Sequence, residues 1–229
     1  MNPSRENSLQ ADKATAANPQ ANAPARISPL YNEVFLKTFG ESKASAKALA
    51  NSVLRYFGID EIDTVKSIKS DAVEPGAVGL KSSRCDVVLV ADEKVIDLEA
   101  QRRKINYDNK ALFYAAKLLV SNTMKGENYD YEKLPQVIVI MLIEGHKMFK
   151  GDQFATICRM AWEHESGTSP GSDRVTLIAI ELDKVAEAYN KGITEEVLSD
   201  ELNAWLYVLA RGYRDQKEVD ELIKGVSVG

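Results

Sequence analysis

Two neighbouring stretches of the chain, 85–90 and 95–101, are dominated by Val, Ile and Leu and flank a short polar segment. Such runs are typical of β-strands, and the short interval between them predicts a hairpin. With a two-residue loop at Asp92 and Glu93, Asp86 lies directly opposite Glu99 on the neighbouring strand. The pattern therefore brings two carboxylates together at the open end of the hairpin.

The period of two assigns the hairpin's side chains to two faces. One face is apolar and carries Val87, Leu89, Ile96, Leu98 and Ala100. The other has Val88, Val90 and Val95 near the turn and, at the open end, Asp86, Asp97, Glu99 and Gln101. Like charges that face each other destabilise a strand pair, so these carboxylates suggest a compensating cation.

The remaining elements follow from periodicity and breakers. The expected helices are one short and one longer helix between 28 and 57 around Gly40, then 105–124, 153–164, 183–191 and 194–214, with a short one near Val219. The expected strands are 64–73, 137–143 and 174–182, with loops at 74–76 and 167–173 and a helix stop at Gly58. Trp162 and Trp205 are expected to be buried or half-buried on helices. This order implies an α/β fold with a mixed sheet, helices on both faces and C-terminal helices.

Composition sets limits on function. Of 229 residues, 45% are hydrophobic and 28% charged, which suits one domain at 28–229 behind a disordered tail at 1–27. The net charge of −5 argues against coating nucleic acid by bulk charge. Two cysteines support neither a disulfide framework nor a zinc cluster, and no segment looks like a signal peptide or membrane span. We expect a cytoplasmic protein with no membrane partner.

The acidic hairpin end has the chemistry of metal-assisted phosphodiester cleavage. Asp86 and Glu99 offer the hard oxygen ligands that Mg²⁺ prefers, and the Ala100 carbonyl is a further candidate ligand. Gln101 is placed to orient a water or phosphate, although a neutral amide is no general base. Asp97 is either a supporting group or an outer, solvated carboxylate. The alternative is a solvated acidic face of a half-exposed sheet, which spacing alone slightly favours.

A basic and aromatic stripe follows the hairpin. Arg102, Arg103 and Lys104 precede a helix on which Tyr107, Lys110, Tyr114 and Lys117 recur at helical spacing. Such a stripe suits a phosphate backbone and unstacked bases. The buried side would then consist of Leu112, Ala115, Ala116 and Leu119. The alternative is a solvated helix face with tyrosines at its margin.

Taken in order, these motifs resemble the PD-(D/E)XK nuclease family transposases, which are related to bacterial recombination-promoting nucleases. The resemblance rests on the blocks 80–86, 97–101, 110–118, 131–143 and 180–184. It implies a restriction-endonuclease-like αβββαβ core and divalent-metal-dependent DNA cleavage, with Mg²⁺ or Mn²⁺, linked to transposition or recombination. It further implies that Asp86 and Glu99 bind metal and that Gln101 replaces the usual Lys. The resemblance also implies a basic approach to the strand Asp, in which Lys81 and Arg84 are expected to contact DNA.

Two departures from the family pattern leave other functions open. Asn32 stands where the family often has Asp, with Glu33 and Glu41 as candidate substitutes, and Lys110 stands where Arg is common. A second hypothesis is therefore a catalytically inactive nuclease-fold module that binds DNA or protein. A third is a homodimer through an apolar C-terminal stripe, although such a stripe more often covers its own sheet. The stripe consists of Leu198, Leu202, Trp205, Leu206 and Leu209.

Overall fold

The computed structural model describes residues 27–74, 83–91, 93–104, 106–122, 130–191 and 200–212. Nearly all of the expected N-terminal tail, the turn residue Asp92 and the expected helix near Val219 lie outside these ranges. No helix within them is long and apolar enough to span a lipid bilayer.

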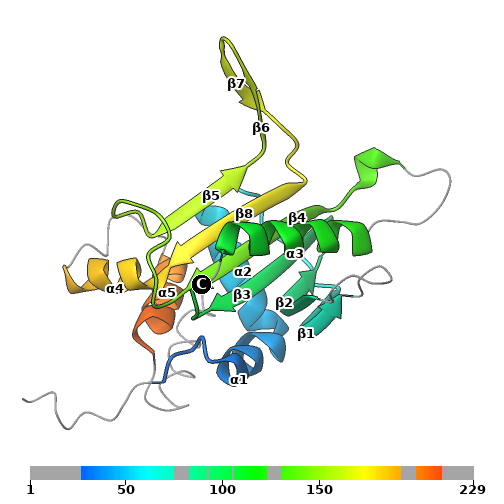
Figure 1. Cartoon of the computed structure of the whole chain (residues 1–229). Helices are drawn as coiled ribbons and strands as arrows, with labels where there is room; N and C mark the ends of the chain where they lie inside the picture. Colours follow the sequence, from blue (N-terminus) through cyan, green and yellow to red (C-terminus); the bar gives the residue numbers. More distant parts are fainter. Residues whose placement is uncertain are drawn as a thin grey trace, which may run out of the picture.

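Groups of helices and groups of strands follow one another along the chain (Figure 1). The helical elements are α1 (Asn32–Phe35), η1 (Leu36–Gly40), α2 (Lys43–Tyr56), α3 (Tyr107–Ser121), η2 (Tyr131–Lys133), α4 (Leu182–Asn190) and α5 (Asp200–Arg211). The strands are β1 (Ser67–Glu74), β2 (Ser83–Val90), β3 (Lys94–Gln101), β4 (Gln136–Ile143), β5 (Ala155–Arg159), β6 (Ala161–His164), β7 (Gly167–Pro170) and β8 (Val175–Glu181). The predicted series of helix, three strands, helix and strand is confirmed.

The strands of the main sheet run in the order β1-β2-β3-β4-β8-β5. Strands β1, β2 and β3 pair antiparallel, β3, β4 and β8 pair parallel, and β5 pairs antiparallel with β8. The sheet is therefore mixed, as predicted. Strand β4 lies inside it, and all but the first residue of β4 is buried, which agrees with its continuous apolar sequence.

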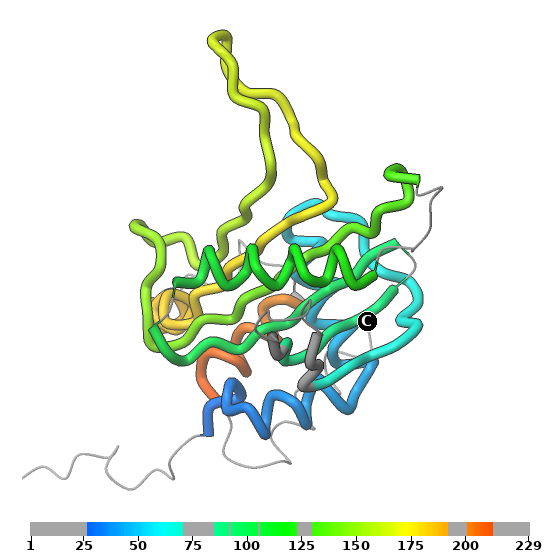
Figure 2. Tube along the Cα trace, turned by 45° about the vertical axis from the view of Figure 1, so that its right-hand side comes forward, coloured from blue at the N-terminus to red at the C-terminus, as the bar shows by residue number. Residues whose placement is uncertain are grey.

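Helices cover both faces of this sheet (Figures 1 and 2). Helix α3 packs on one face, where Ala111, Ala115 and Leu118 contact a cluster that includes Val139 and Met141. The opposite face is covered by η1, α2, α4 and α5, and its cluster contains the largest buried side chains. Gly58 adopts a φ of 64° just after α2, so the predicted helix stop is confirmed.

The apolar stripe of α5 belongs to the protein's own core. Four of its residues are at most 2% exposed and belong to the buried cluster that also contains the apolar side chains of α2: Leu202, Trp205, Leu206 and Leu209. The expectation of a buried Trp205 on a helix is confirmed, while Leu198 lies outside the described residues. These four side chains are therefore not available as a dimer surface.

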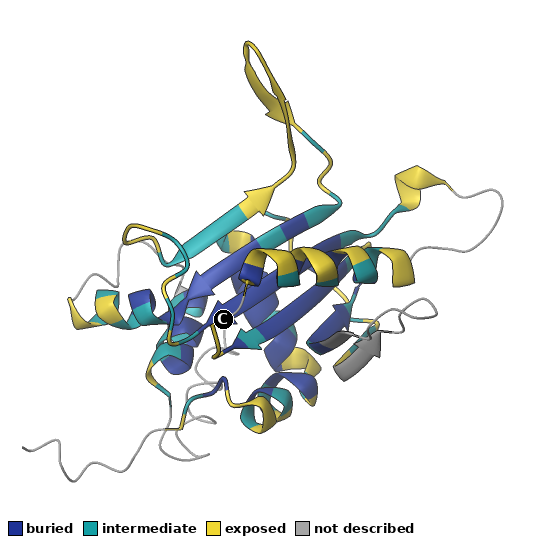
Figure 3. Ribbon diagram, in the orientation of Figure 1, coloured by how far each residue is buried: buried dark blue, intermediate teal, exposed yellow. Residues whose placement is uncertain are grey.

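The segment 153–164 is not the helix that we expected. It contains β5 and β6, and the polar loop expected at 167–173 contains β7, which pairs with β6. The β6–β7 hairpin projects from the body, with every residue of both strands exposed (Figure 3). Trp162 is 69% exposed on it, contrary to expectation. Strands β6 and β7 form by pairing with each other. Because neither strand has a buried face, their sequences lack the alternation of apolar and polar residues that predicts a strand.

Candidate active site

The predicted hairpin register is confirmed. Val88 pairs with Asp97 and Val87 with Leu98, and the Ala91 N–H donates to the Lys94 carbonyl, as a short turn requires. Most apolar side chains of this hairpin belong to the buried cluster between the sheet and α2. Val88 and Val95 belong to the buried cluster between the sheet and α3. The polar side chains Asp97, Glu99 and Gln101 consequently lie between the sheet and α3.

Asp86 and Glu99 interlock where β2 and β3 stop pairing. Regular pairing of the two strands ends at Val87 and Leu98. Beyond this point the Asp86 N–H donates to Glu99 Oε1, and the Ala100 N–H donates to Asp86 Oδ2, each over 2.9 Å. Each carboxylate thus takes the place of a backbone acceptor on the neighbouring strand. The result is two carboxylates fixed by main-chain donors on adjacent strands.

The Ala100 carbonyl lies on the same side of β3 as these groups. The N–H and C=O of one strand residue point in the same direction, and the Ala100 N–H points to Asp86. Its carbonyl oxygen is therefore directed toward β2, beside the two carboxylates. Its role as a metal ligand stays a prediction.

Glu99 Oε2 accepts two further donors. Lys110 Nζ, from the first half of α3, lies 2.6 Å from it, and Gln101 Nε2 lies 3.0 Å from it. The Glu99 side chain is fully buried, while that of Lys110 is 22% exposed. Lys110 also lies 4.9 Å from the ring centre of Tyr114, one turn further along α3. The sequence assigned Lys110 to a phosphate contact, and its ion pair with Glu99 was not anticipated.

The acidic face is buried. Asp97 and Glu99 are 0% exposed and Gln101 is 7% exposed, so the alternative of a solvated sheet face is wrong. Burial, reinforced by the Asp86 charge, raises the pKa of Glu99 to about 7, and Lys110 opposes this rise. Burial, together with the charges of Glu99 and Asp86, raises the pKa of Asp97 well above its usual range. The site is thus short of positive charge.

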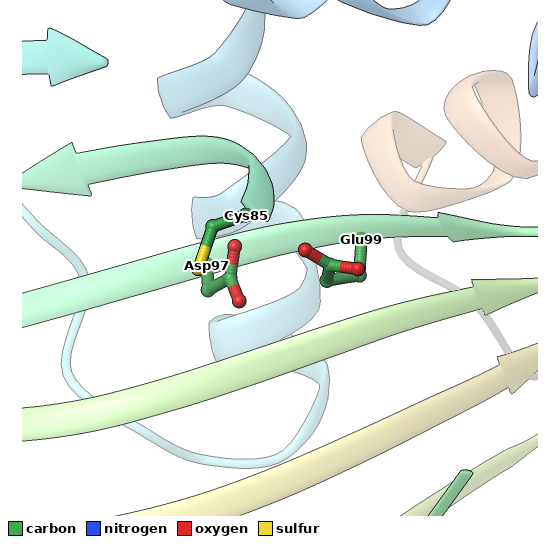
Figure 4. Close-up of side chains that lie close together, drawn as sticks. All are labelled: Cys85, Asp97 and Glu99. Carbon is green, nitrogen blue, oxygen red and sulfur yellow. The ribbon is translucent and has the colours of Figure 1, made fainter. Parts of the chain in front are cut away.

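Asp97 lies between Cys85 and Glu99 (Figure 4). One ligand atom from each of the three side chains lies within 4.8 Å of the other two. Neither carboxylate oxygen of Asp97 has a hydrogen-bond partner of ordinary geometry among the described residues. Because Asp97 is fully buried, it is not the outer, solvated carboxylate that the sequence left open.

Helix α3 faces the sheet with a different stripe from the one expected. Tyr107, Ala111, Ala115 and Leu118 are buried, whereas Leu112 is 57% exposed and Ala116 is also exposed. The Asn106 side chain caps the helix by accepting from the Asn109 N–H. The predicted buried side is correct only for Ala115 and, in part, the half-buried Leu119.

The residues predicted to bind DNA differ in their accessibility. Arg103 is exposed, and Tyr114 and Lys117 are half-buried. Arg102 is exposed but donates to Glu144 Oε2 over 2.7 Å and stacks on the Tyr31 ring. Tyr107 is 5% exposed, and its hydroxyl donates to the Arg103 carbonyl. In this conformation Tyr107 is a core residue, contrary to its predicted role.

Lys81 and the Arg84 side chain lie outside the described residues. Glu33 and Glu41 are exposed on the opening helical segment, and no described contact joins either of them to Asp86 or Glu99.

A second buried ion pair was missed. Glu181 and Lys184 are bonded over 2.7 Å, with side chains 1% and 3% exposed. Glu181 also accepts from the N–H groups of Met148 and Phe149, and Lys184 donates to the Phe149 and Gln153 carbonyls. The pair fastens the loop after β4 to α4. Its sequence signals were the spacing of three residues at a strand-to-helix junction and the place of both residues in the block 180–184 of the family resemblance.

A mixed sheet flanked by helices, with interlocked carboxylates on adjacent strands, defines a restriction-endonuclease-like nuclease fold. The family model of the PD-(D/E)XK nuclease family transposases matches residues 32–225, and the chain belongs to this family. Its membership implies a nuclease-type function and DNA as the substrate. No curated protein matches the chain.

Proposed function

We propose that this protein is a Mg²⁺-dependent (or Mn²⁺-dependent) DNA endonuclease that acts in transposition or recombination. The interlock of Asp86 and Glu99 carries the proposal. It holds two hard oxygen donors on neighbouring strands at the point where the strands separate. The proposal includes a cytoplasmic location.

The divalent ion would be held by the carboxylates of Asp86 and Glu99 and by the Ala100 carbonyl, all of which are oxygen donors of the kind that Mg²⁺ prefers. The raised pKa of Glu99 and the unpartnered oxygens of Asp97 fit a site that lacks positive charge. A bound ion would acidify the attacking water and neutralise charge on the scissile phosphate.

Gln101 is proposed to orient the attacking water molecule rather than to remove its proton. Its Nε2 donates to Glu99 Oε2, which fixes the amide plane. The amide oxygen is then a fixed acceptor for a water molecule, because an amide offers both a donor and an acceptor. A neutral amide does not take the proton of that water.

Lys110 supplies the positive charge that Gln101 lacks. Its ammonium and the Gln101 amide donate to the same oxygen of Glu99. Its long, flexible side chain allows the ammonium to leave Glu99 for a phosphate once a metal ion neutralises that carboxylate. Lys110 is therefore proposed to contact the phosphate from within the site.

The DNA backbone is proposed to lie along the side of α3 near the end of β3. Arg103 and Lys104 are exposed there, and Lys117 and Tyr114 are half-buried on the same helix. Arg102 joins them if its bond to Glu144 opens. Lys81 and Arg84 stay proposed contacts from the approach to β2. Phosphate contacts of this kind give affinity without sequence preference.

The test is cleavage of supercoiled and linear DNA with Mg²⁺ or Mn²⁺ by the wild type and by Asp86→Asn and Glu99→Gln. We expect each variant to lose at least a hundredfold in rate. Glu132→Gln, an exposed change on η2, is the matched control and should cleave like the wild type. Cleavage at wild-type rates by Asp86→Asn or Glu99→Gln would remove these residues from catalysis.

A second candidate function is DNA or protein binding without cleavage. The ion pair between Lys110 and Glu99 favours it, because an ammonium already compensates a proposed metal ligand. In that case DNA binding by Glu99→Gln equals that of the wild type and neither protein cleaves. A homodimer is a further proposal, and it would have to use a surface other than the buried α5 stripe.

A further inference from the structure

The side chains of Cys85, Asp97 and Glu99 form a cluster on the face of the hairpin that α3 covers (Figure 4). All three residues are 0% exposed. Asp97 is not one of the ligands proposed for Mg²⁺. Cys85 carries a thiol, which is not a ligand that Mg²⁺ prefers. The cluster therefore has a chemistry of its own.

Asp97 is the observation that points to a ligand. A buried carboxylate normally has hydrogen-bond partners, because removing it from water without them is costly. Neither oxygen of Asp97 has a partner of ordinary hydrogen-bond geometry among the described residues, although the neighbouring Cys85 thiol, a weak donor, lies close enough to lower the pKa of Asp97 by hydrogen bonding. Figure 4 shows its carboxylate between Cys85 and Glu99.

The surrounding charges are unbalanced. Asp97 lies beside Glu99, which is interlocked with Asp86, and the ammonium in contact with this group is that of Lys110, 2.6 Å from Glu99 Oε2. Three carboxylates and one ammonium leave a net deficit of two positive charges when all are ionised. A divalent cation next to Asp97 would neutralise it.

The donor types select a metal of borderline softness. A thiolate with two carboxylates suits Zn²⁺, whereas Mg²⁺ takes oxygen ligands alone. Bonds of ~2.3 Å to sulfur and ~2.0 Å to oxygen place tetrahedral ligand atoms about 3.5 Å apart. The three donors, within 4.8 Å of one another, need to approach by on the order of 1 Å.

We propose that Cys85, Asp97 and Glu99 form a second metal site, which takes Zn²⁺ or a similar transition-metal ion. Three protein ligands leave the fourth tetrahedral position for water. The binding reaction releases the thiol proton of Cys85 to solvent, and no redox step is involved. Because Glu99 would belong to both sites, Zn²⁺ would compete with Mg²⁺, and only this consequence rests on the proposed function.

The test is a Co²⁺ titration of the full-length, metal-free protein, monitored by absorption spectroscopy. The buffer contains a phosphine reductant, which keeps both cysteines reduced. We expect one Co²⁺ per chain, a thiolate-to-cobalt charge-transfer band, and loss of that band when Zn²⁺ is added. Cys85→Ser should lose the band. Cys158→Ser, which changes the other cysteine, is exposed on β5 and should keep it.

Two further variants separate this site from the magnesium site. Asp97→Asn should weaken Co²⁺ binding at least tenfold, while Asp86→Asn should keep the band. Zn²⁺ should raise the melting temperature of the wild type and of Cys158→Ser but not that of Cys85→Ser, which also checks folding. Absence of the band at stoichiometric Co²⁺, its survival in Cys85→Ser, or its loss in Cys158→Ser would each overturn the proposal.

Discussion

Lys110 Nζ lies 2.6 Å from Glu99 Oε2 and joins helix α3 to strand β3 at the centre of the acidic site. In the absence of a metal ion, this ammonium is the charge that opposes the pKa rise of Glu99. The same contact lies next to Ala111, one of the apolar residues with which α3 packs on the sheet. Electrostatics and helix packing are thus coupled at one pair of residues.

Replacing Lys110 with Met should destabilise the metal-free protein at pH 8 by about 3 kcal/mol, because it leaves a buried carboxylate without its cation. Glu99→Gln should remove most of that penalty in the double variant, which a denaturant-unfolding cycle measures. Lys110→Arg retains a cation and is the control. Additive effects of Lys110→Met and Glu99→Gln would show that the pair is not coupled.

The stability of the metal-free protein should depend on pH through Glu99. Its pKa rises from 4.5 to about 7 on folding, so between these values the folded state binds more protons than the unfolded state. The free energy of unfolding therefore falls as pH rises from about 4.5 to 7, by on the order of 3 kcal/mol.

The measurement is chemical unfolding of the wild type and of Glu99→Gln at pH 5 and pH 8. The free energy of unfolding of Glu99→Gln, relative to that of the wild type, should rise from pH 5 to pH 8. Asp97, whose pKa is also raised, adds a contribution of the same sign in both proteins. Glu132→Gln should follow the wild type, and an equal difference at both pH values would contradict the assignment.

The two ion pairs that each include one residue of α4 should differ in their contribution to stability. Lys184 and Glu181 are buried, whereas Lys147 and Glu187 are each 50% exposed. Lys184→Met leaves a buried charge and should cost about 3–5 kcal/mol, while Lys147→Met, which breaks a solvent-screened pair, should leave the free energy of unfolding nearly unchanged. Thermal and denaturant unfolding measure both, and similar losses would mean that burial does not set their strength.

Arg103 should contribute a phosphate contact. Arg103→Ala should weaken binding of DNA of any sequence and lower the salt dependence of binding by about one counterion. Lys133→Ala, an exposed basic residue on η2 before β4, is the matched control. Fluorescence anisotropy over a salt series measures the slopes, and equal slopes for Arg103→Ala and the wild type would exclude this contact.

The hairpin was predictable because its information is local. A short turn and a period of two determine which residues of β2 and β3 face each other, so the pairing of Val88 with Asp97 follows from the sequence. The central strand β4 was predictable because its unbroken apolar run has few alternatives. The opposition of Asp86 and Glu99 came from the same local rules.

The missed features depend on contacts between distant segments. Strand β5 forms by pairing with β8, a relationship that no local pattern carries. The burial of Asp97 follows from the position of α3 over the sheet. The choice of Tyr107 rather than Leu112 as a buried residue also depends on that position. Sequence alone therefore located the carboxylates but not their surroundings.

The most direct test of the account is a Mn²⁺ titration of the metal-free protein, with free Mn²⁺ followed by electron paramagnetic resonance. We expect one Mn²⁺ site from which Mg²⁺ displaces the bound Mn²⁺. The affinity of this site should fall at least tenfold in Asp86→Asn and in Glu99→Gln and stay unchanged in Glu132→Gln. Mn²⁺ binding of wild-type strength in both Asp86→Asn and Glu99→Gln would contradict it.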